Sequence, residues 1–327
     1  MAKSSGQKSK ILYILKYLEE ESSINNPITT KQIIDYLEKN SITAERKSIY
    51  DDIESLKSFG IKINKNSNRS GGGYYISERE FELPELKLLV DAVQACRFIP
   101  QDMTRKLIKK LERKASAADK KQLQRDVEVG EIRTINGNIF SNIDGIYQGI
   151  HENCQISFDY MDWNIQKKLE SRDGKIRVVS PWKLIWNNEF YYLAAYDKKD
   201  KKIKHYRVDK MDNVKVLEDK RENLKEYNNM NVVQYTNGIF GMFGGEVVNV
   251  TLNFPKHMIG VVIDRFGHEV SVRPLPDDTI NVHVRVNVSE QFFGWLAGLR
   301  EARIVSPSEV KEKYLDHLHK ILENQQK

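Results

Sequence analysis

The sequence predicts a multidomain α+β protein with a winged helix-turn-helix first, then a helical linker, a small β-barrel and a ferredoxin-like α/β sandwich. Three observations lead to this fold class. The chain has 327 residues, which is too long for one small core. Helical periodicity dominates before residue 141 and gives way to strand-like alternation after it. The final segments follow the order βαββαβα, which is typical of ferredoxin-like sandwiches.

The composition indicates an ordinary soluble protein and argues against several special classes. Charged residues make up 30% of the chain and hydrophobic residues 40%. The net charge of +6 permits contact with nucleic acid but does not require it. Cys96 and Cys154 form no CxxC pair, which argues against a disulfide framework or structural zinc. The first residues lack an apolar signal region and no stretch is long enough to span a membrane, so we expect a cytoplasmic protein.

Residues 1–78 carry the pattern of a winged helix-turn-helix. Apolar residues at helical spacing predict a first helix over residues 8–21. Thr29 or Thr30 is suited to cap a second helix, and Thr43 to cap a third that Gly60 ends. In such units the third helix enters the DNA major groove, so a double-stranded DNA operator is the expected partner.

The outward face of the third helix supplies the candidate DNA contacts. If Ile49, Ile53 and Leu56 pack inward, the basic start of the helix faces outward. Arginine and lysine pair with phosphates or guanine, and hydroxyl groups donate to phosphates or base edges. The candidate contacts on this helix are Thr43, Arg46, Lys47, Ser48 and Tyr50. The alternative is a solvated helix face whose charges meet no DNA.

A glycine-rich hairpin follows the third helix. Residues 61–63 and 74–76 are predicted to be its strands. Arg69 lies near the tip, where three glycines permit close backbone approach, so it is the candidate wing contact to a minor groove or to phosphates. The alternative is a flexible surface hairpin.

The pattern TAERKSIYDDIESL, followed by GIKI and the glycine-rich loop, resembles the DeoR-like winged helices of WYL-domain transcriptional regulators. In that family the third helix commonly carries two basic residues, a hydroxyl residue, an aliphatic residue and an aspartate. Those positions are Arg46, Lys47, Ser48, Ile49 and Asp52. Many members have arginine where this chain has Asp51, which removes one expected phosphate contact.

Residues 79–140 are predicted to form a helical linker, with a dimer contact as a further option. Two helical runs are separated near Pro100. The polar face of the second run is basic, and its members are Arg105, Lys106, Lys109, Lys110, Arg113 and Lys114. Such a face is usually solvated, and the alternative is an electrostatic approach surface for DNA or another anion.

Residues 141–223 begin with a helix and continue as short strands over 154–160, 175–186, 190–196 and 203–208, which predicts a small bent barrel. The segments VSPWKLIWNNEFYYLAAYD and HYRVDKM look like the WYL domain, with Tyr191 in place of its tryptophan. The resemblance implies an Sm- or SH3-like barrel that senses a negatively charged ligand, in several members a nucleotide or single-stranded nucleic acid.

Six residues of this segment have side chains suited to such a ligand. They are Tyr160, Arg177, Ser180, Tyr192, His205 and Arg207. Arginine forks match phosphate oxygens, tyrosine rings stack on bases, and serine and histidine add hydrogen bonds. The alternative is a structural role. Arg207 can pair with Asp209 instead of a ligand, and either Tyr191 or Tyr192 belongs to the core. Trp182 and Trp186 are expected to be packing residues.

The C-terminal third consists of a linker, residues 224–245, and the predicted sandwich, residues 246–327. The run GIFGMFGG lacks the GK[ST] ending of a phosphate loop and is interpreted as a flexible apolar docking segment. The sandwich resembles the extension that often follows WYL domains. Four of its arginines face either a ligand, a partner subunit or surface carboxylates: Arg265, Arg273, Arg285 and Arg300.

No catalytic, metal or cofactor signature emerges. The seven histidines are scattered, and HExxH, GxSxG, P-loop and GxGxxG patterns are absent. We therefore expect no enzyme but a homodimeric, ligand-responsive transcription regulator, and more specifically a repressor. Two alternatives stay open: an accessory single-strand nucleic-acid-binding protein of a phage-defence or DNA-repair system, and an enzyme regulator that binds a protein partner.

Overall fold

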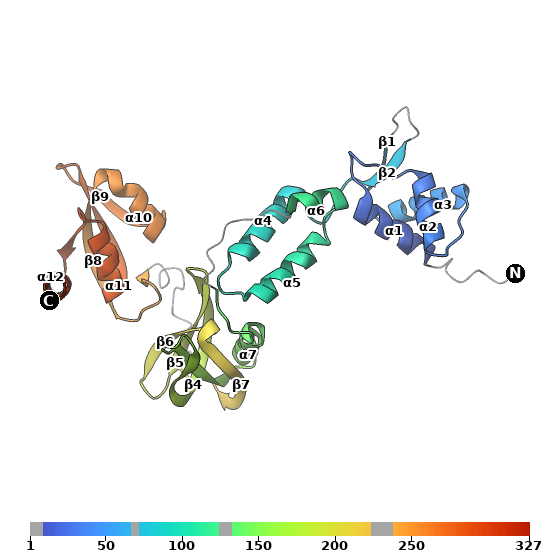
Figure 1. Cartoon of the computed structure of the whole chain (residues 1–327). Helices are drawn as coiled ribbons and strands as arrows, with labels where there is room; N and C mark the ends of the chain where they lie inside the picture. The colour runs from blue at the N-terminus through green and yellow to red at the C-terminus, as the bar shows by residue number, and fades with distance from the viewer. Residues whose placement is uncertain (1–8, 67–71, 124–132, 224–237) are drawn as a thin grey trace. The chain divides into compact units, whose positions relative to one another are not determined.

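The computed structural model describes residues 9–66, 72–123, 133–223 and 238–327. The chain divides into two compact units, Met1–Thr134 and Ile135–Lys327. Helices dominate the first unit and strands the second (Figure 1). The protein is therefore a multidomain α+β protein, as the sequence predicts.

Three helices form the core of the first unit: α1 (Lys10–Glu21), α2 (Thr30–Lys39) and α3 (Arg46–Ser58). They bury a common apolar cluster that includes Ile14, Leu18, Ile33, Leu37, Ile49 and Ile53. Helix α2 begins with the predicted threonine cap, because the Thr29 hydroxyl accepts the Gln32 N–H and the Gln32 side chain accepts the Thr29 N–H at 2.8 Å. This reciprocal capping box satisfies two backbone donors at the helix start.

Helix α3 begins later than predicted. Its N-cap is Glu45, whose backbone is extended and whose side chain makes no capping hydrogen bond. The prediction that Thr43 caps this helix is wrong, because α3 does not begin until Arg46 and the residue before it, Glu45, is the N-cap. The predicted end is confirmed: Gly60, at φ +111°, follows the last turn in a conformation that favours glycine.

The hairpin after α3 consists of β1 (Ile63–Asn66) and β2 (Gly73–Ile76), so its strands are shifted from the predicted ranges. They pair antiparallel, with Ile63 opposite Ile76. Gly73 fits closely against the preceding chain, since a Cβ there would lie 2.7 Å from the Pro27 carbonyl carbon. Arg69, the predicted wing contact, lies outside the described residues.

The helical linker comprises α4 (Leu83–Ala95), α5 (Gln101–Glu112) and α6 (Ala117–Leu123). Arg133 holds the turn between α4 and α5, because its Nη1 donates to the carbonyls of Cys96 at 2.8 Å and Ile99 at 3.3 Å. The basic side chains of α5 and the following turn are exposed, as both a solvated face and an approach surface for an anion require.

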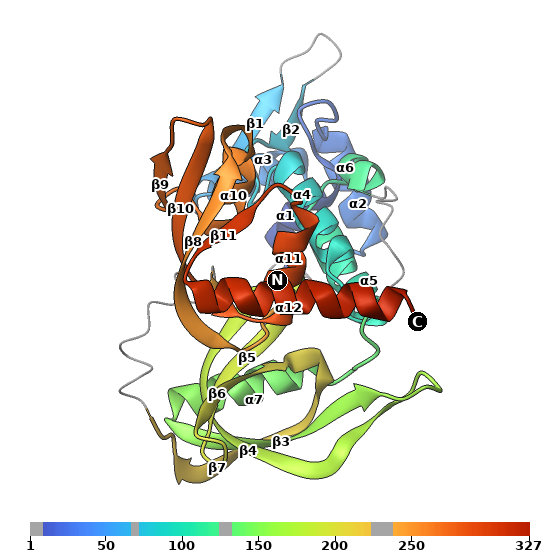
Figure 2. The same cartoon turned by 90° about the vertical axis from the view of Figure 1, so that its left-hand side faces the viewer.

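In the second unit, α7 (Ile139–His151) packs on a curved sheet of five described strands. The strands are β3 (Cys154–Trp163), β4 (Leu169–Asn187), β5 (Phe190–Asp197), β6 (Lys202–Arg207) and β7 (Met211–Lys220), and the 3-10 turn η1 (Val208–Lys210) joins the last two. The β3–β4 hairpin projects beyond the sheet (Figure 2).

This sheet differs from the predicted barrel. Its order is β6-β5-β4-β3-β7, and the edge strands β6 and β7 do not pair with each other within the described residues, so no closed barrel is found. Strand β7 was not predicted from the sequence. Strand β4 is continuous through Ser180 and Pro181, where its pairing passes from β3 to β5. Trp182 and Phe158 fill the core of this sheet.

The C-terminal segment folds as a second sheet with its own core. Its strands are β8 (Glu246–Pro255), β9 (Ser271–Pro274), β10 (Thr279–Val288) and β11 (Arg303–Ser306), and its helices are α10 (Ile259–Phe266), α11 (Glu290–Gly298) and α12 (Ser308–Gln325). A 3-10 turn, η2 (Lys256–Met258), precedes α10. The antiparallel strand order is β11-β8-β10-β9. The elements follow the predicted order, and Ser289 caps α11 as expected.

Candidate functional site

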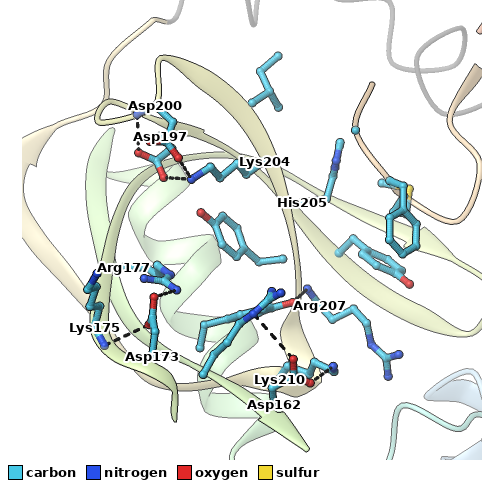
Figure 3. Close-up of a pocket in the computed structure, with 18 of the residues that line it drawn as sticks. Asp162, Asp173, Lys175, Arg177, Asp197, Asp200, Lys204, His205, Arg207 and Lys210 are labelled. Atoms are coloured by element: carbon cyan, nitrogen blue, oxygen red, sulfur yellow. Dashed lines mark hydrogen bonds and ion pairs between the residues drawn. The ribbon is translucent and has the colours of Figure 1, made fainter. Parts of the chain in front are cut away.

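A cleft of about 980 Å³ opens along strands β3, β4 and β6 of the curved sheet (Figure 3). Among the residues that the structure describes, seven basic side chains line it: Arg172, Lys175, Arg177, Lys199, Lys204, Arg207 and Lys210. Four carboxylates also line it: Asp162, Asp173, Asp197 and Asp200. The basic surplus makes the cleft attractive to an anion.

Arg207 is held in position by a buried carboxylate. Its Nε and Nη2 donate to the two carboxylate oxygens of Asp209 at 3.0 and 2.7 Å. Its guanidinium also lies 3.7 Å from the centre of the Phe190 ring. Burial alone would lower the pKa of Arg207, but the hydrogen bonds and charge of Asp209 raise it. The predicted pair with Asp209 is therefore present, and Arg207 also lines the cleft.

Tyr160 supports Arg207 from the neighbouring strand. Its hydroxyl accepts the backbone N–H of Arg207 at 3.2 Å, and its ring packs edge-on against Tyr206 at 5.3 Å. Burial raises the pKa of Tyr160, so its hydroxyl is neutral at physiological pH. Tyr160 is thus both a cleft residue and a positioning residue for Arg207.

Tyr206 lines the cleft although the sequence analysis did not select it. Its side chain is 5% exposed, and within the described residues its hydroxyl has no hydrogen-bond partner. Burial raises its pKa to about 12. Its place between His205 and Arg207, which are both predicted ligand contacts, was the available signal.

Two other basic side chains of the cleft, Arg177 and Lys204, are tied to carboxylates at the rim. Arg177 pairs with Asp173 at 2.8 Å, and this hydrogen bond lowers the pKa of Asp173. Lys204 contacts Asp200 and pairs with Asp197 at 2.6 Å. Such partly exposed pairs contribute only about 0–1 kcal/mol each, so a phosphate can compete for these cations.

His205 and Tyr192, two further predicted ligand contacts, also line the cleft, and both are partly buried. Burial lowers the pKa of His205 to about 4, so near neutral pH the ring can form hydrogen bonds but carries no charge. Burial raises the pKa of Tyr192, whose ring packs beside Ile185 and Ala194.

Ser180 is not part of the cleft, which corrects the prediction. Its side chain is buried and its hydroxyl accepts the backbone N–H of Glu222 at 2.8 Å. The reason is its place in β4, where pairing changes from β3 to β5 and the hydroxyl anchors the chain after β7. Trp182 is fully buried, as expected of a packing residue, whereas Trp186 is half exposed and packs edge-on against Tyr191.

The start of α3 carries most of the predicted DNA contacts. Arg46 and Lys47 are exposed in its first turn, and Thr43 is exposed just before it. The Arg46 Nε donates to the Tyr50 hydroxyl at 2.7 Å, and this hydrogen bond lowers the pKa of Tyr50. Arg46 and Tyr50 therefore act as one polar unit on the outward face.

Ser48 is engaged within the protein by a residue that the sequence analysis missed. The ammonium of Lys10, at the start of α1, donates to the Ser48 hydroxyl and pairs with Asp52 at 2.8 Å. Lys10 is 6% exposed. Ser48 and Asp52 lie one turn apart in α3 and so share one face of the helix. In the sequence, this pair of polar residues was the only sign that a cation from elsewhere in the chain binds there.

Arg265 differs from the other arginines of the C-terminal segment. Arg273, Arg285 and Arg300 are exposed, whereas Arg265 is half-buried and donates to the Ile239 carbonyl at 2.7 Å. Its guanidinium stacks on the Phe240 ring at 3.8 Å. Arg265 therefore contacts Ile239 and Phe240, two residues of the run GIFGMFGG that precedes β8.

The described ranges contain neither a metal-binding cluster nor a membrane-spanning helix. No group of three or more histidine, cysteine, aspartate or glutamate side chains there is arranged to hold a metal ion. No helix there has the length and hydropathy needed to cross a lipid bilayer.

Three family models match the chain. The WYL domain matches residues 141–216, which contain the cleft strands, and the WCX domain matches residues 246–322. The chain is therefore a WYL-domain protein with a C-terminal WCX domain. The model described as the FokI D3 domain matches residues 12–68, the segment of α1 to β1. This domain order fits a WYL-domain transcriptional regulator.

Solved structures similar to this chain include proteasome accessory factor B/C (PafBC) of Arthrobacter aurescens. That likeness has 16% identity and a TM-score of 0.28, and it covers 95% of this chain and 48% of that one. This chain thus spans about half of its length. A CRISPR Cas-related protein has 14% identity and a TM-score of 0.36, with 98% of this chain and 84% of that one covered. No curated protein matches the chain.

Proposed function

We propose that the protein is a ligand-responsive, sequence-specific DNA-binding transcription regulator whose WYL cleft takes a nucleotide or single-stranded nucleic acid. The observation that carries the proposal is the basic surplus of the cleft around Arg207. In this proposal the curved sheet acts as an Sm- or SH3-like barrel, the C-terminal sheet is a ferredoxin-like sandwich, and the protein has no catalytic step, metal or cofactor.

The cleft offers three kinds of contact that suit a phosphate ester. Arg207 and Arg177 present planar forks for charge-assisted hydrogen bonds to phosphate oxygens. Tyr192 and Tyr160 present aromatic rings. The Tyr206 hydroxyl is a buried donor, and leaving such a group unsatisfied costs about 1–3 kcal/mol. A ligand oxygen that accepts from Tyr206 would recover part of that cost.

The winged unit is the proposed reader of duplex DNA. Arg46 and Lys47 are exposed at the end of α3 that enters a major groove. Glu45 and Asp51 are exposed beside them and offset their charge. One copy should therefore bind weakly, which favours a homodimer on a palindromic operator. A ligand that binds two dimer arrangements with different affinities then shifts DNA binding, and we expect repression.

The same charge comparison favours a second candidate. The start of α3 is nearly neutral, whereas the cleft is basic. An accessory protein that binds single strands in a phage-defence or DNA-repair system would show this contrast.

A mobility-shift titration at stated salt separates the two candidates. The probes are the upstream duplex of the protein's own gene and a labelled single-stranded oligothymidylate. Under the first candidate, Arg46→Ala/Lys47→Ala weakens duplex binding by about 30-fold or more, since each base or phosphate contact contributes about 1–3 kcal/mol. The matched control is Lys109→Ala/Lys110→Ala, which removes two exposed charges from α5 and should leave duplex binding near the parent's.

Equal duplex binding by the α3 variant and the parent would refute the regulator proposal. Loss of oligothymidylate binding in Arg207→Ala, together with duplex binding that no α3 substitution affects, would establish the second candidate. If the α5 control weakens duplex binding as much as the α3 variant, the DNA interface includes the linker rather than α3 alone.

A further inference from the structure

A short apolar segment, Gly238–Gly244, borders the cleft although it precedes β8 of the C-terminal sheet. We refer to these residues as the strap. Ile239, Phe240 and Met242 are buried, each with 4% exposure or less, while Phe243 is 54% exposed. The strap therefore keeps one large aromatic side chain in solvent.

The buried strap residues contact both sheets of the second unit. Ile239 and Met242 pack with Ile185 of β4 and Ala194 of β5. Phe240 packs instead into the C-terminal core, 5.1 Å from the ring of Phe292. The strap is thus fixed at both sides by apolar contacts.

Polar and steric constraints fix the path of the strap. Arg265 donates to the Ile239 carbonyl at 2.7 Å and stacks on Phe240 at 3.8 Å. Gly238 allows the chain to pass β10, since a Cβ there would lie 2.5 Å from the Arg285 carbonyl oxygen. These contacts leave the strap little freedom to move away.

A tight turn places Phe243 at the cleft. The chain takes positive φ at Gly241 (+57°) and Met242 (+61°), and the Phe243 N–H donates to the Phe240 carbonyl at 3.1 Å. Gly241 to Gly244 then form part of the wall of the cleft, together with Tyr192 and Arg207. In Figure 3 the pale orange ribbon of this part of the chain borders the cleft on the side of His205.

We infer that Phe243 is a stacking platform for the base of the cleft ligand, so that the ligand carries a nucleobase as well as phosphate. The inference rests on the proposed anion-binding function of the cleft. An aromatic ring that a fixed turn exposes beside a basic cleft presents a face on which any base can stack. A polyphosphate without a base uses the cationic side chains of the cleft but gains nothing from Phe243.

Competition binding to the full chain tests this inference. The probes are a labelled single-stranded oligothymidylate and unlabelled tripolyphosphate, which competes for the cations. Phe243→Ala should weaken oligothymidylate binding by about 5- to 150-fold, the range expected for one lost base stack, and leave the tripolyphosphate affinity unchanged. Phe243→Tyr should restore binding, and Phe243→Leu should not, since leucine is apolar but has no ring. Phe140→Ala on α7 is the control, because Phe140 is similarly exposed (42%) and lies outside the cleft.

The outcomes separate this inference from the proposed function. If the parent binds neither probe, or if Arg207→Ala binds both as the parent does, the proposed function of the cleft fails. If Arg207→Ala loses both probes while Phe243→Ala keeps the parent's oligothymidylate affinity, only the stacking role is overturned. Full binding by Phe243→Leu would likewise overturn it, because contact with any apolar side chain would then suffice.

Discussion

Replacing Lys10 by methionine tests whether a buried ion pair holds helix α3 in place. The Lys10 ammonium is 2.8 Å from Asp52, and the two side chains are 8% and 19% exposed. Methionine keeps an unbranched stem of similar length but removes the charge and the hydrogen bond to Ser48. Asp52 would then keep a poorly solvated charge without its partner.

The expected cost follows from this burial. Removing one partner of a fully buried pair costs about 3–5 kcal/mol, whereas an exposed pair contributes about 0–1 kcal/mol. Because one-fifth of the Asp52 side chain reaches solvent, we expect a loss of about 2–3 kcal/mol in the local stability of α3. That loss corresponds to amide exchange about 30- to 150-fold faster.

Hydrogen–deuterium exchange of the full chain, read on peptides that cover Arg46–Ser58, measures this change directly. Lys57→Met is the matched control, because Lys57 pairs with Glu54 at the same 2.8 Å but with side chains 35% and 70% exposed. The control should speed exchange by less than about fivefold. Equal effects of the two substitutions, or unchanged exchange in Lys10→Met, would refute the role of burial. Asp52→Asn added to Lys10→Met should recover part of the loss, since it removes the stranded charge.

Two further predictions concern the cleft and the wing. The folded-state pKa of His205, about 4, lies below its ordinary 6.5, so the unfolded chain binds the proton first as pH falls. Stability should therefore decline from about pH 6.5 toward pH 4, and His205→Asn should flatten this decline in urea unfolding; an unchanged slope would show that other groups cause it. Gly73→Ala should lower the melting temperature through about 1–3 kcal/mol of strain, because its Cβ would lie 2.7 Å from the Pro27 backbone. Gly137→Ala, with no atom within 4 Å of its added Cβ, is the control, and equal melting of the two variants would contradict the steric argument.

The features that the sequence predicts well depend on neighbouring residues. Thr29, one of the two predicted caps of α2, bonds to Gln32 only three positions later, and Gly60 ends α3 through its own backbone conformation. The four strands at 154–208 and the elements after residue 246 follow from alternation and turn residues within each segment. Arg207 and Asp209 form another local pair, and their closeness in the chain made the pairing foreseeable.

The features that the sequence did not predict depend on distant residues. Lys10 meets Ser48 across 38 positions, and no local pattern marks a lysine as buried. Strand β7 contains only a weak alternation, interrupted by positive φ at Asn213, and gains its place by pairing with β3. Ser180 was assigned to the ligand by its chemistry, but its partner, the Glu222 N–H, lies 42 positions away. The sequence likewise did not show that the edge strands β6 and β7 do not pair with each other within the described residues.

Strand β4 connects two features that have been described separately. It contributes Arg177 to the cleft and Ile185 to the apolar surface beneath the strap. Each residue faces its own neighbours only in the present register, and a shift of one position turns every later side chain to the opposite face of a sheet. The number of residues from Arg177 to Ile185 is therefore fixed, because an insertion or a deletion between them would turn one of the two away from its present neighbours.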